Sequence, residues 1–402
     1  MRKTSLKVAV VTGVAAVLAL SACSNSNNNK SSPGGLGTAS NNGGNGSNSG
    51  KTYKIGFEGP LSGDNAQLGI NEENAVALAI EQANAKGDLG FKLEELKSDD
   101  VGDPAKAPAA ATTLQQDNAV VGVIGPSFSG ATNAVAASYD AAHLVLISPS
   151  ATNPTLTSKG YKSFHRIVPP DSLEGKEAGD WLATKSKDVF VVDDLSDYGK
   201  GAADAVQQEL KAKGIKTSRQ GVDAKTTDYS VIAQKVKSSG ATALFYGGYD
   251  TQAAQFAKAL KSAGFAGITM TGNGGKSSKF TDGSGPAGNG WYFSCGCLDA
   301  TVAPQAKDFA AAYQTKFNTP PSTYSPESYD ATNALIQVIK TVASSGAVTR
   351  QAVWDGVNNL TYNGITTTIK FQPNGEVEQQ VINLYQQKAG KIELLGDITK
   401  QS

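Results

Sequence analysis

The sequence predicts an α/β protein made of two units, each built around a parallel β-sheet with helices on both faces. Short apolar strands alternate with helical segments along most of the chain, a pattern typical of parallel sheets. This alternation stops at Pro169-Pro170 and then starts again, which indicates a second unit. Three further helical segments follow residue 303. They are more helices than are needed to cover the sheet of the second unit. We therefore expect the chain to return to the first unit there.

The first unit opens with an alternating segment at residues 53–57, which predicts a half-buried strand. A helix follows over residues 71–86, where apolar residues recur on one face and Gly87 marks the end. The other elements expected in this unit are strands over 92–96, 120–124 and 144–148 and helices over 104–116 and 130–142.

The second unit repeats the same rhythm after the proline pair. Its expected elements are strands over 189–192, 243–246 and 268–270 and helices over 199–213, 229–239 and 251–263. The three helical segments of the returning chain are expected over 304–317, 327–343 and 350–360.

Charge excludes a general attraction to nucleic acid or to an anionic membrane surface. The chain carries 36 basic and 36 acidic side chains, so its formal net charge is zero. Recognition must therefore depend on local geometry, and we expect no nucleic-acid partner.

The amino terminus predicts export from the cell. Arg2, Lys3 and Lys7 precede an apolar run over residues 8–20, which is too short to span a bilayer as a stable helix. The run ends in Leu20-Ser21-Ala22-Cys23, which resembles a bacterial lipobox, where a peptidase cuts before a cysteine that becomes lipid-modified. An ordinary secretory signal is the alternative.

We therefore expect a lipoprotein signal peptide over residues 1–22 and a lipid anchor on Cys23. Residues 24–50 are mostly Ser, Asn and Gly, with too little apolar surface to offset chain entropy. With the anchor, the segment 23–50 is expected to be a flexible tether to the folded part.

The folded part contains two cysteines, Cys295 and Cys297. In an oxidising exterior this pair favours a small disulfide, although metal binding and two free thiols remain alternatives. Two cysteines without a nearby histidine make a poor zinc site, because such sites need three or four ligands. We expect no metal and no cofactor.

Gly125-Pro126-Ser127-Phe128-Ser129 resembles the nucleophile elbow of hydrolases, but serine stands where the sharp turn needs glycine. Only His143 and His165 are available as a base, and both fit structural positions. The pairs Asp99-Asp100 and Asp193-Asp194 lie at strand ends, where we expect solvated turns. An exported hydrolase is therefore the least favoured function.

Two strand ends favour a binding site for a carboxylate. The strand over 120–124 runs into a loop with Ser129, and the strand over 144–148 runs into a loop with Thr152. Carboxyl ends of parallel strands lie at one sheet edge, where hydroxyl and backbone N–H groups can bind an anion. The alternative is that Ser129 only caps a helix and Thr152 only forms a turn.

Several short motifs in order along the folded part carry a family resemblance. They are Gly59-Pro60-Leu61-Ser62-Gly63, Asp99-Asp100 with Asp103-Pro104, Ile124-Gly125, Ser148-Pro149-Ser150-Ala151-Thr152-Asn153-Pro154, Phe164-His165-Arg166, Asp197-Tyr198-Gly199-Lys200-Gly201 and Tyr246-Gly247-Gly248-Tyr249. From about Tyr53 onward the chain resembles the leucine/isoleucine/valine-binding proteins among type I periplasmic binding proteins. That class also includes amide and urea binders and receptor ectodomains.

The resemblance implies two Rossmann-like lobes with parallel sheets, joined by a hinge of three crossings and closing over a ligand. The N-terminal lobe is expected over residues 51–170 and 298–377. The C-terminal lobe is expected over residues 171–297 and 378–402.

The resemblance also assigns ligand-binding residues. Ser129 and Thr152 would hold a carboxylate, and the backbone carbonyl of Ser150 would receive an amino group. Tyr198 and Tyr249 would reach the ligand from the second lobe. Phe128 and Asn273 complete the predicted ligand-binding set.

The chain departs from the family pattern at several of these places. Asn273 stands where the family has an ammonium-binding glutamate, and Leu68 stands where a tyrosine often covers the ligand. Gly102 and Phe128 replace a cysteine pair of some relatives. Asn273 weakens the case for a free α-amino acid, because the charge opposite the ammonium group is gone.

Two other carboxylates, Asp171 and Asp250, are candidates to replace that charge. The function expected from the resemblance is the substrate-binding subunit of an ABC transporter for import. It would deliver a small carboxylate ligand, a branched-chain or other apolar amino acid, to a membrane permease. We expect a monomer, exported and lipid-anchored on the outer side of the cell membrane or in the periplasm. A sensory module for amides or aromatic acids is the alternative.

Overall fold

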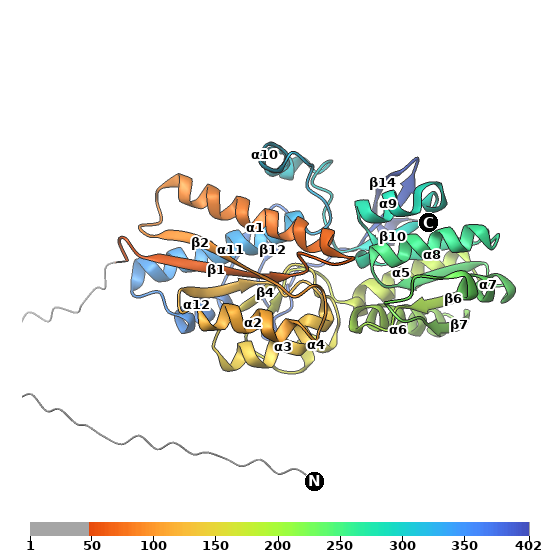
Figure 1. The fold of residues 1–402 in the computed structure, drawn as a ribbon, viewed down its shortest axis with the longest axis horizontal. Helices are drawn as coiled ribbons and strands as arrows, with labels where there is room; N and C mark the ends of the chain where they lie inside the picture. The colour runs from red at the N-terminus through yellow and green to blue at the C-terminus, as the bar shows by residue number, and fades with distance from the viewer. Residues whose placement is uncertain (1–47, 402) are drawn as a thin grey trace, which may run out of the picture. The chain divides into compact units, whose positions relative to one another are not determined.

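The computed structural model of the protein describes residues 48–401, which form two lobes around separate sheets (Figure 1). The predicted α/β class is confirmed. The predicted signal peptide, Cys23 and nearly all of the tether lie outside the described residues. No helix within residues 48–401 is both long and apolar enough to cross a bilayer.

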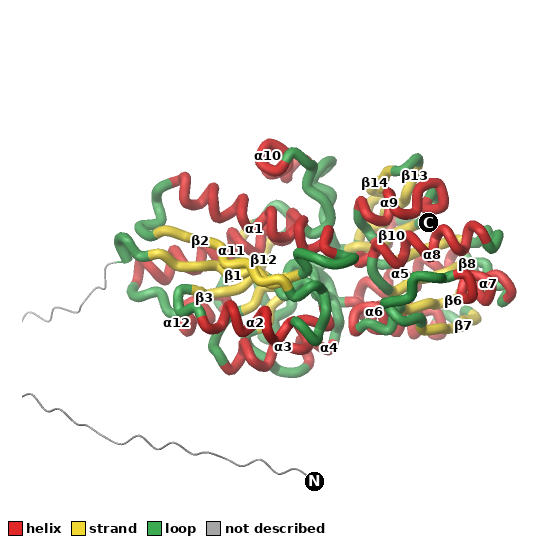
Figure 2. The backbone as a smooth tube through the Cα atoms, in the orientation of Figure 1, coloured by secondary structure: helices red, strands yellow, loops and turns green. Residues whose placement is uncertain are grey.

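The N-terminal lobe contains a five-stranded parallel sheet in the order β2-β1-β3-β4-β5 within the described chain. Its strands are β1 (Thr52–Gly59), β2 (Lys92–Asp99), β3 (Val120–Ile124), β4 (Leu146–Ser148) and β5 (Phe164–Arg166). Its first helices are α1 (Ala66–Lys86), α2 (Ala107–Gln116), α3 (Ser129–Ala141) and α4 (Thr155–Ser158). Helix α1 covers one face of the sheet and α2 and α3 cover the other, so the central strand β3 is buried throughout (Figure 2).

The C-terminal lobe contains a seven-stranded sheet in the order β14-β13-β10-β9-β8-β6-β7 within residues 48–401. Its strands are β6 (Asp188–Asp193), β7 (Lys216–Gly221), β8 (Ala243–Gly247), β9 (Ile268–Thr271), β10 (Tyr292–Cys295), β13 (Asn383–Lys388) and β14 (Lys391–Asp397). Its helices are α5 (Asp171–Lys185), α6 (Asp197–Ala212), α7 (Ser230–Ser238), α8 (Asp250–Ser262) and α9 (Ser278–Ser284). Strands β6 to β10 are parallel, whereas β13 pairs antiparallel with β10 and β14.

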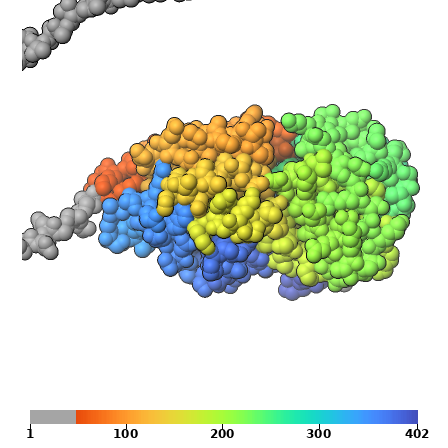
Figure 3. All heavy atoms as spheres, turned by 90° about the horizontal axis from the view of Figure 1, so that it is seen from below, coloured from red at the N-terminus to blue at the C-terminus, as the bar shows by residue number. Residues whose placement is uncertain are grey.

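After β10 the chain returns to the N-terminal lobe. The returning elements are α10 (Lys307–Phe317), α11 (Ser325–Ser345), α12 (Arg350–Asn358), β11 (Tyr362–Asn363) and β12 (Thr368–Ile369). Helix α11 packs on α1, where Tyr329 Oη donates a hydrogen bond of 2.6 Å to Gln82 Oε1. Figure 3 shows the early orange and late blue segments together in one lobe, apart from the green segments of the other.

Three segments connect the lobes, at residues 167–170, 296–298 and 377–382. All three contribute to the lining of one cavity of about 220 Å³. We propose lobe boundaries within these segments, at the positions inferred from the sequence.

Helix α5 is absent from the sequence prediction, and its packing explains why. Its buried face includes Gly175 and Gly179, so the apolar pattern of a helix is weak. A side chain at residue 175 would meet the Ala205 Cβ at 2.4 Å, because α5 lies close against α6. Glycine permits this close contact. Because glycine adds no apolar side chain to the buried face, the helix lacks the pattern from which it could be predicted.

Candidate functional site

The candidate site is a cavity of roughly 10 Å³ between the lobes. Its lining residues are Leu68, Ser127, Phe128, Ser129, Ser150 and Tyr324 from the N-terminal lobe and Tyr198, Tyr249, Asn273 and Gly274 from the C-terminal lobe. The lining thus includes every residue of the predicted ligand-binding set except Thr152. The apolar and aromatic side chains form its walls, and polar groups stand at both ends.

The N-terminal end of the cavity is formed by the loops that follow β3 and β4. Gly125 turns the first loop with φ at 112°, and a Cβ there would lie 2.2 Å from the Glu58 carbonyl oxygen, so this turn requires glycine. Ser129 Oγ accepts a hydrogen bond of 3.1 Å from the Asn153 backbone N–H, which joins the two loops. Because Ser129 accepts in this bond, its own hydroxyl proton remains available as a donor.

A second set of hydroxyls fixes the floor of this end. Ser127 Oγ donates to Glu72 Oε2 at 2.6 Å, and Ser150 Oγ donates to the Ser127 carbonyl at 2.7 Å. Burial raises the pKa of Glu72 to about 8. The Ser127 hydroxyl is therefore bound by a buried carboxyl group, which favours a structural role over a nucleophile.

Arg166, at the end of β5, holds the second loop from behind. Its Nη1 donates to the carbonyl oxygens of Ala151 at 3.1 Å and Asn153 at 2.9 Å. Its Nε donates to Glu376 Oε2 at 2.9 Å, and Nη2 also pairs with this carboxylate. This buried ion pair fixes the backbone on either side of Thr152.

Thr152 lies behind the cavity lining rather than in it. Its side chain is buried, and Oγ1 has no hydrogen-bond partner among the described residues. Its carbonyl accepts the Asp171 backbone N–H at 2.8 Å, which brings it to the start of α5. Burial, followed by the charge of Glu174, raises the pKa of Asp171 to about 8.

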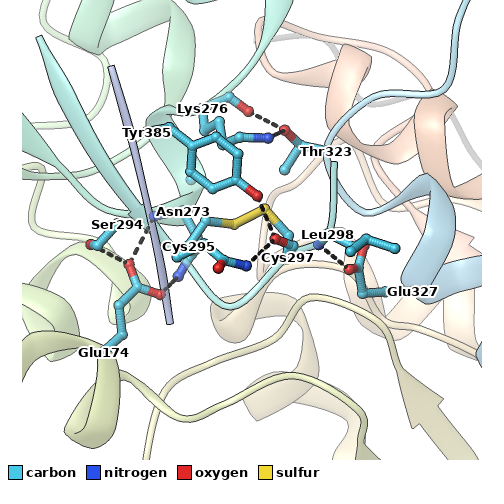
Figure 4. The surroundings of a disulfide bond; sticks show 12 residues. Glu174, Asn273, Lys276, Ser294, Cys295, Cys297, Leu298, Thr323, Glu327 and Tyr385 are labelled. Atoms are coloured by element: carbon cyan, nitrogen blue, oxygen red, sulfur yellow. Dashed lines mark hydrogen bonds between the residues drawn. A yellow bond between two sulfur atoms is a disulfide. The ribbon is translucent and has the colours of Figure 1, made fainter. Parts of the chain in front are cut away.

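The C-terminal end of the cavity is Asn273, held by Glu174 from α5 (Figure 4). Asn273 Nδ2 donates to Glu174 Oε2 at 2.6 Å, and the Asn273 backbone N–H donates to Oε1 at 3.0 Å. Ser294 Oγ also donates to Oε1, at 2.8 Å. Burial raises the pKa of Glu174 to about 7, against the effect of these three donors.

The other predicted acids do not reach the cavity lining. Asp250 accepts hydrogen bonds from Asn65 Nδ2 at 2.7 Å and Ser277 Oγ at 2.5 Å, and it faces the rim of the cleft. Asp171 is buried beside Thr152, and neither of its carboxylate oxygens has a partner among the described residues. Glu174 is thus the carboxylate that is bonded to Asn273.

Aromatic rings from both lobes close the cavity. The rings of Phe128 and Tyr249 stack with centroids 4.2 Å apart and planes at 21°. The Tyr198 ring lies 5.1 Å from Tyr249, and its hydroxyl accepts the Gly274 backbone N–H at 2.9 Å. Tyr324 lies opposite in the N-terminal lobe, and its buried hydroxyl has no partner among residues 48–401.

Polar contacts join the lobes at the rims of the cleft. On one rim Asn65 Nδ2 donates to Asp250 Oδ1 at 2.7 Å. On the other, Asn133 Nδ2 donates to Asp197 Oδ2 at 2.8 Å, and Asn153 Nδ2 donates to the Asp197 carbonyl at 2.6 Å. The structure is therefore that of closed lobes.

A disulfide joins Cys295 and Cys297. The Cys297 carbonyl accepts hydrogen bonds from Tyr385 Oη at 2.6 Å and Asn383 Nδ2 at 3.3 Å (Figure 4). The disulfide thus lies at the crossing from β10 back to the N-terminal lobe. No group of three or more His, Cys, Asp or Glu side chains within residues 48–401 is arranged to hold a metal ion.

The hydrolase alternative finds no support in the positions of the histidines. His143 Nδ1 is 2.8 Å from Gln351 Oε1, and the buried His165 contacts Asn358 Oδ1 at 3.3 Å. Neither ring bonds a serine side chain in any contact of the described residues.

The expectation of solvated turns is wrong for three of the predicted aspartates. Asp100, Asp193 and Asp194 are buried. Asp194 Oδ1 accepts the Ser196 backbone N–H at 2.9 Å, and Asp100 Oδ1 accepts the Gly102 N–H at 2.7 Å. Because each carboxylate satisfies the N–H groups of its own turn, the turn can be buried.

Sequence reasoning missed Glu174 and Tyr324. A signal for Glu174 was present, since acids directly after Pro169-Pro170 are typical of a helix start. Tyr324 directly precedes α11, in a left-handed conformation with φ at 69°. The sequence places the start of that helix two residues too late, at Glu327, and so leaves Tyr324 in an unassigned loop.

Two α/β lobes that close on a small, aromatic-walled cavity define a binding protein that encloses its ligand. A sequence model described as periplasmic binding protein matches residues 52–391, and the chain belongs to this family. The predicted family is confirmed.

One curated relative matches nearly the whole folded part, and another matches about half of the chain. A leucine-, isoleucine-, valine-, threonine- and alanine-binding protein of Pseudomonas aeruginosa is 28% identical over 345 residues, which cover 83% of this chain and 90% of the relative. A Leu/Ile/Val/Thr-binding protein of Salmonella typhimurium is 34% identical over 215 residues, which cover 52% of this chain and 59% of that protein.

Solved structures agree with the fold. The branched-chain amino acid transporter substrate-binding protein LivJ of Streptococcus pneumoniae, in complex with isoleucine, is similar with a TM-score of 0.78 and 26% identity, covering 86% of this chain and all (100%) of that one. The leucine-binding protein LivK of Thermotoga maritima has a TM-score of 0.79 at 22% identity, covering 85% of this chain and 97% of that one.

Proposed function

We propose that the protein is the substrate-binding subunit of an ABC importer and captures a branched-chain or other apolar amino acid by closure of its lobes. One observation carries the proposal. The cavity has hydroxyl donors at its N-terminal end, an amide backed by a carboxylate at its C-terminal end, and apolar and aromatic side chains between. An α-amino acid with an apolar side chain has matching groups.

At the N-terminal end, Ser129 and Thr152 would bind the ligand carboxylate. Ser129 lines the cavity and its hydroxyl can donate to the ligand directly. Thr152 lies behind the lining, beside Asp171, so its role at the carboxylate rests on the family resemblance. By the family resemblance, the backbone carbonyl of Ser150 would receive the ligand amino group. Tyr198 and Tyr249 would complete the enclosure from the second lobe.

Ligand entry requires the lobes to separate. A cavity of roughly 10 Å³ is close to the minimum that holds one water, far below the size of an amino acid. Phe128 and Tyr249 must therefore move apart as the cleft opens, and ligand must contact both lobes to favour closure again.

The partner and location follow from the proposed role. The importer would include a membrane permease that receives the ligand from the closed protein, and the protein would act as an exported monomer. Cys23 would carry the lipid, and residues 24–50 would let the folded part reach the permease. Catalysis is no part of the proposal.

A thermal-shift screen tests the ligand class, because a ligand at 100 times its Kd adds about 2.7 kcal/mol of stability. We expect leucine, isoleucine or valine to raise the Tm, and alanine amide and benzoate to leave it unchanged. A rise with amides or aromatic acids alone would favour the sensory alternative, for which the neutral Asn273 is the supporting observation.

A further inference from the structure

We propose that Glu174 is the positioning residue that makes the site selective for a ligand carrying an ammonium group. It orients Asn273 so that the amide presents its carbonyl oxygen to the cavity, and it supplies the negative charge that this position otherwise lacks. The inference rests on the proposed function and specifies which chemical group binds at the C-terminal end.

The first step is the orientation of Asn273. Its Nδ2 donates to Glu174 Oε2 at 2.6 Å, and its backbone N–H donates to Oε1 at 3.0 Å. Both oxygens of Glu174 accept hydrogen bonds, Oε2 from Asn273 Nδ2 and Oε1 from the Asn273 backbone N–H and Ser294 Oγ, so the NH₂ group of the amide faces Glu174. The amide oxygen then points away from Glu174, and Asn273 itself lines the cavity.

The second step concerns charge. Glu174 is buried, and none of the ion pairs formed by the described residues includes it. Its three hydrogen-bond donors, from Asn273 and Ser294, are neutral, and Asp171 one turn away is another buried acid. A buried carboxylate without a cation is costly. A ligand ammonium group at the Asn273 carbonyl would offset that cost, whereas an uncharged group would not.

The third step is location. Glu174 lies in the first turn of α5, where the helix dipole favours a negative charge. Asp250, the other buried acid considered from the sequence, is bonded to Asn65 and Ser277 at the rim. Glu72 contacts the cavity wall through Ser127 at the N-terminal end, so the network behind Asn273 is the one that couples a carboxylate to the C-terminal end of the wall.

The test is calorimetry with leucine and with 4-methylpentanoic acid, its analogue without the amino group. We expect wild type to bind leucine more tightly, and Glu174→Gln to reduce that preference by roughly tenfold or more. Glutamine keeps the size of the side chain, and its carbonyl oxygen can still accept from the Asn273 backbone N–H and Ser294 Oγ. Its NH₂ group cannot accept from Asn273 Nδ2, so the variant removes both the charge and the bond that orients the Asn273 amide. The double variant Glu174→Gln with Asn273→Glu should restore the preference, because it returns a carboxylate to the cavity wall.

Glu177→Gln is the matched control, since it makes the same charge change one turn further along α5, outside the contacts to Asn273. If Glu174→Gln weakens both compounds equally, or neither, while wild type prefers leucine, the inference about Glu174 is wrong and the proposed function stands. If wild type binds no α-amino acid, both are wrong. If Glu174→Gln fails to fold, the double variant still tests the inference. If the double variant does not prefer leucine over 4-methylpentanoic acid, a carboxylate at residue 273 does not replace the charge of Glu174, and the inference is wrong.

Discussion

The ring of Phe128 lies face to face with that of Tyr249, so one aromatic pair closes the cleft from opposite lobes, with centroids 4.2 Å apart. Such pairs contribute about 0.5–1.5 kcal/mol beyond their burial. The stack and the polar contacts at the rims together stabilise the closed lobes, and opening must break them. The energy of lobe closure is therefore measurable through residues that lie outside the cavity.

Asn65→Ala should weaken leucine binding by roughly five- to a hundredfold, which corresponds to two net hydrogen bonds. The variant removes the bonds from Asn65 Nδ2 to Asp250 Oδ1 at 2.7 Å and to Gln252 Oε1 at 3.0 Å, which join the two lobes and which opening would break. Calorimetry measures the affinity. Small-angle scattering of wild type should give a smaller radius of gyration with leucine than without leucine.

The control for this experiment is Asn84→Ala. Asn84 also makes two hydrogen bonds, both with Leu93 inside the N-terminal lobe. It should lower the Tm and leave the affinity unchanged. Equal affinities of wild type and Asn65→Ala, with identical scattering profiles, would argue against lobe closure.

Ser129→Ala and Thr152→Val should each weaken a carboxylate ligand by roughly tenfold to a hundredfold, because hydrogen bonds to a charged group are worth about 1.5–3 kcal/mol. Thr112→Val is the matched control, since its hydroxyl bonds the Pro108 carbonyl on an exposed part of α2. If Ser129→Ala binds leucine with unchanged affinity, the ligand carboxylate does not bind at this end of the cavity.

Stability should fall as pH rises from 5 to 9. Burial raises the pKa of Glu58 and Glu72 to about 8 and that of Asp100 to about 7, whereas unfolded carboxyl groups ionise near pH 4. Between these values the folded state holds more protons than the unfolded state, so raising the pH favours unfolding. The contribution is fully present below the unfolded pKa and is lost once the pH exceeds the folded pKa.

The measurement is the Tm across that pH range for wild type and Glu72→Gln. The glutamine cannot ionise, and its carbonyl can still accept the Ser127 hydroxyl, so the slope should be shallower. A Tm that rises towards pH 9 would contradict the assignment of neutral, buried acids in this lobe.

The disulfide should contribute little to stability. Cys295 and Cys297 are separated by 2 positions, so the bond closes a very short loop, and its entropic effect should be below the roughly 3 kcal/mol of a 15-residue loop. Mass spectrometry after alkylation should find both thiols blocked until a reductant is added, and Cys295→Ser with Cys297→Ser should lower the Tm only slightly. Alkylation of both without reductant would contradict the bond.

The N-terminal end of the site was predictable because its residues follow directly from local pattern. Ser129 and Ser150 come just after buried parallel strands, whose carboxyl ends meet at one sheet edge. The C-terminal end was not predictable in the same way. Glu174 and Asn273 are 99 positions apart in the sequence. No local sequence pattern indicates a hydrogen bond between residues so far apart along the chain. Tyr198 and Tyr249 came from family resemblance rather than from periodicity.

The buried pair of Arg166 and Glu376 has a further consequence for how the specificity of this protein can change. It supports the carboxylate end from within one lobe, while Glu174 supports Asn273 from within the other. Substitutions behind Asn273 can therefore vary in evolution, or in a laboratory biosensor, while the opposite end keeps its shape. The binding site therefore consists of two half-sites with separate supports. Substitutions in one half-site can change which analyte a biosensor detects, while the structure of the other half-site is kept.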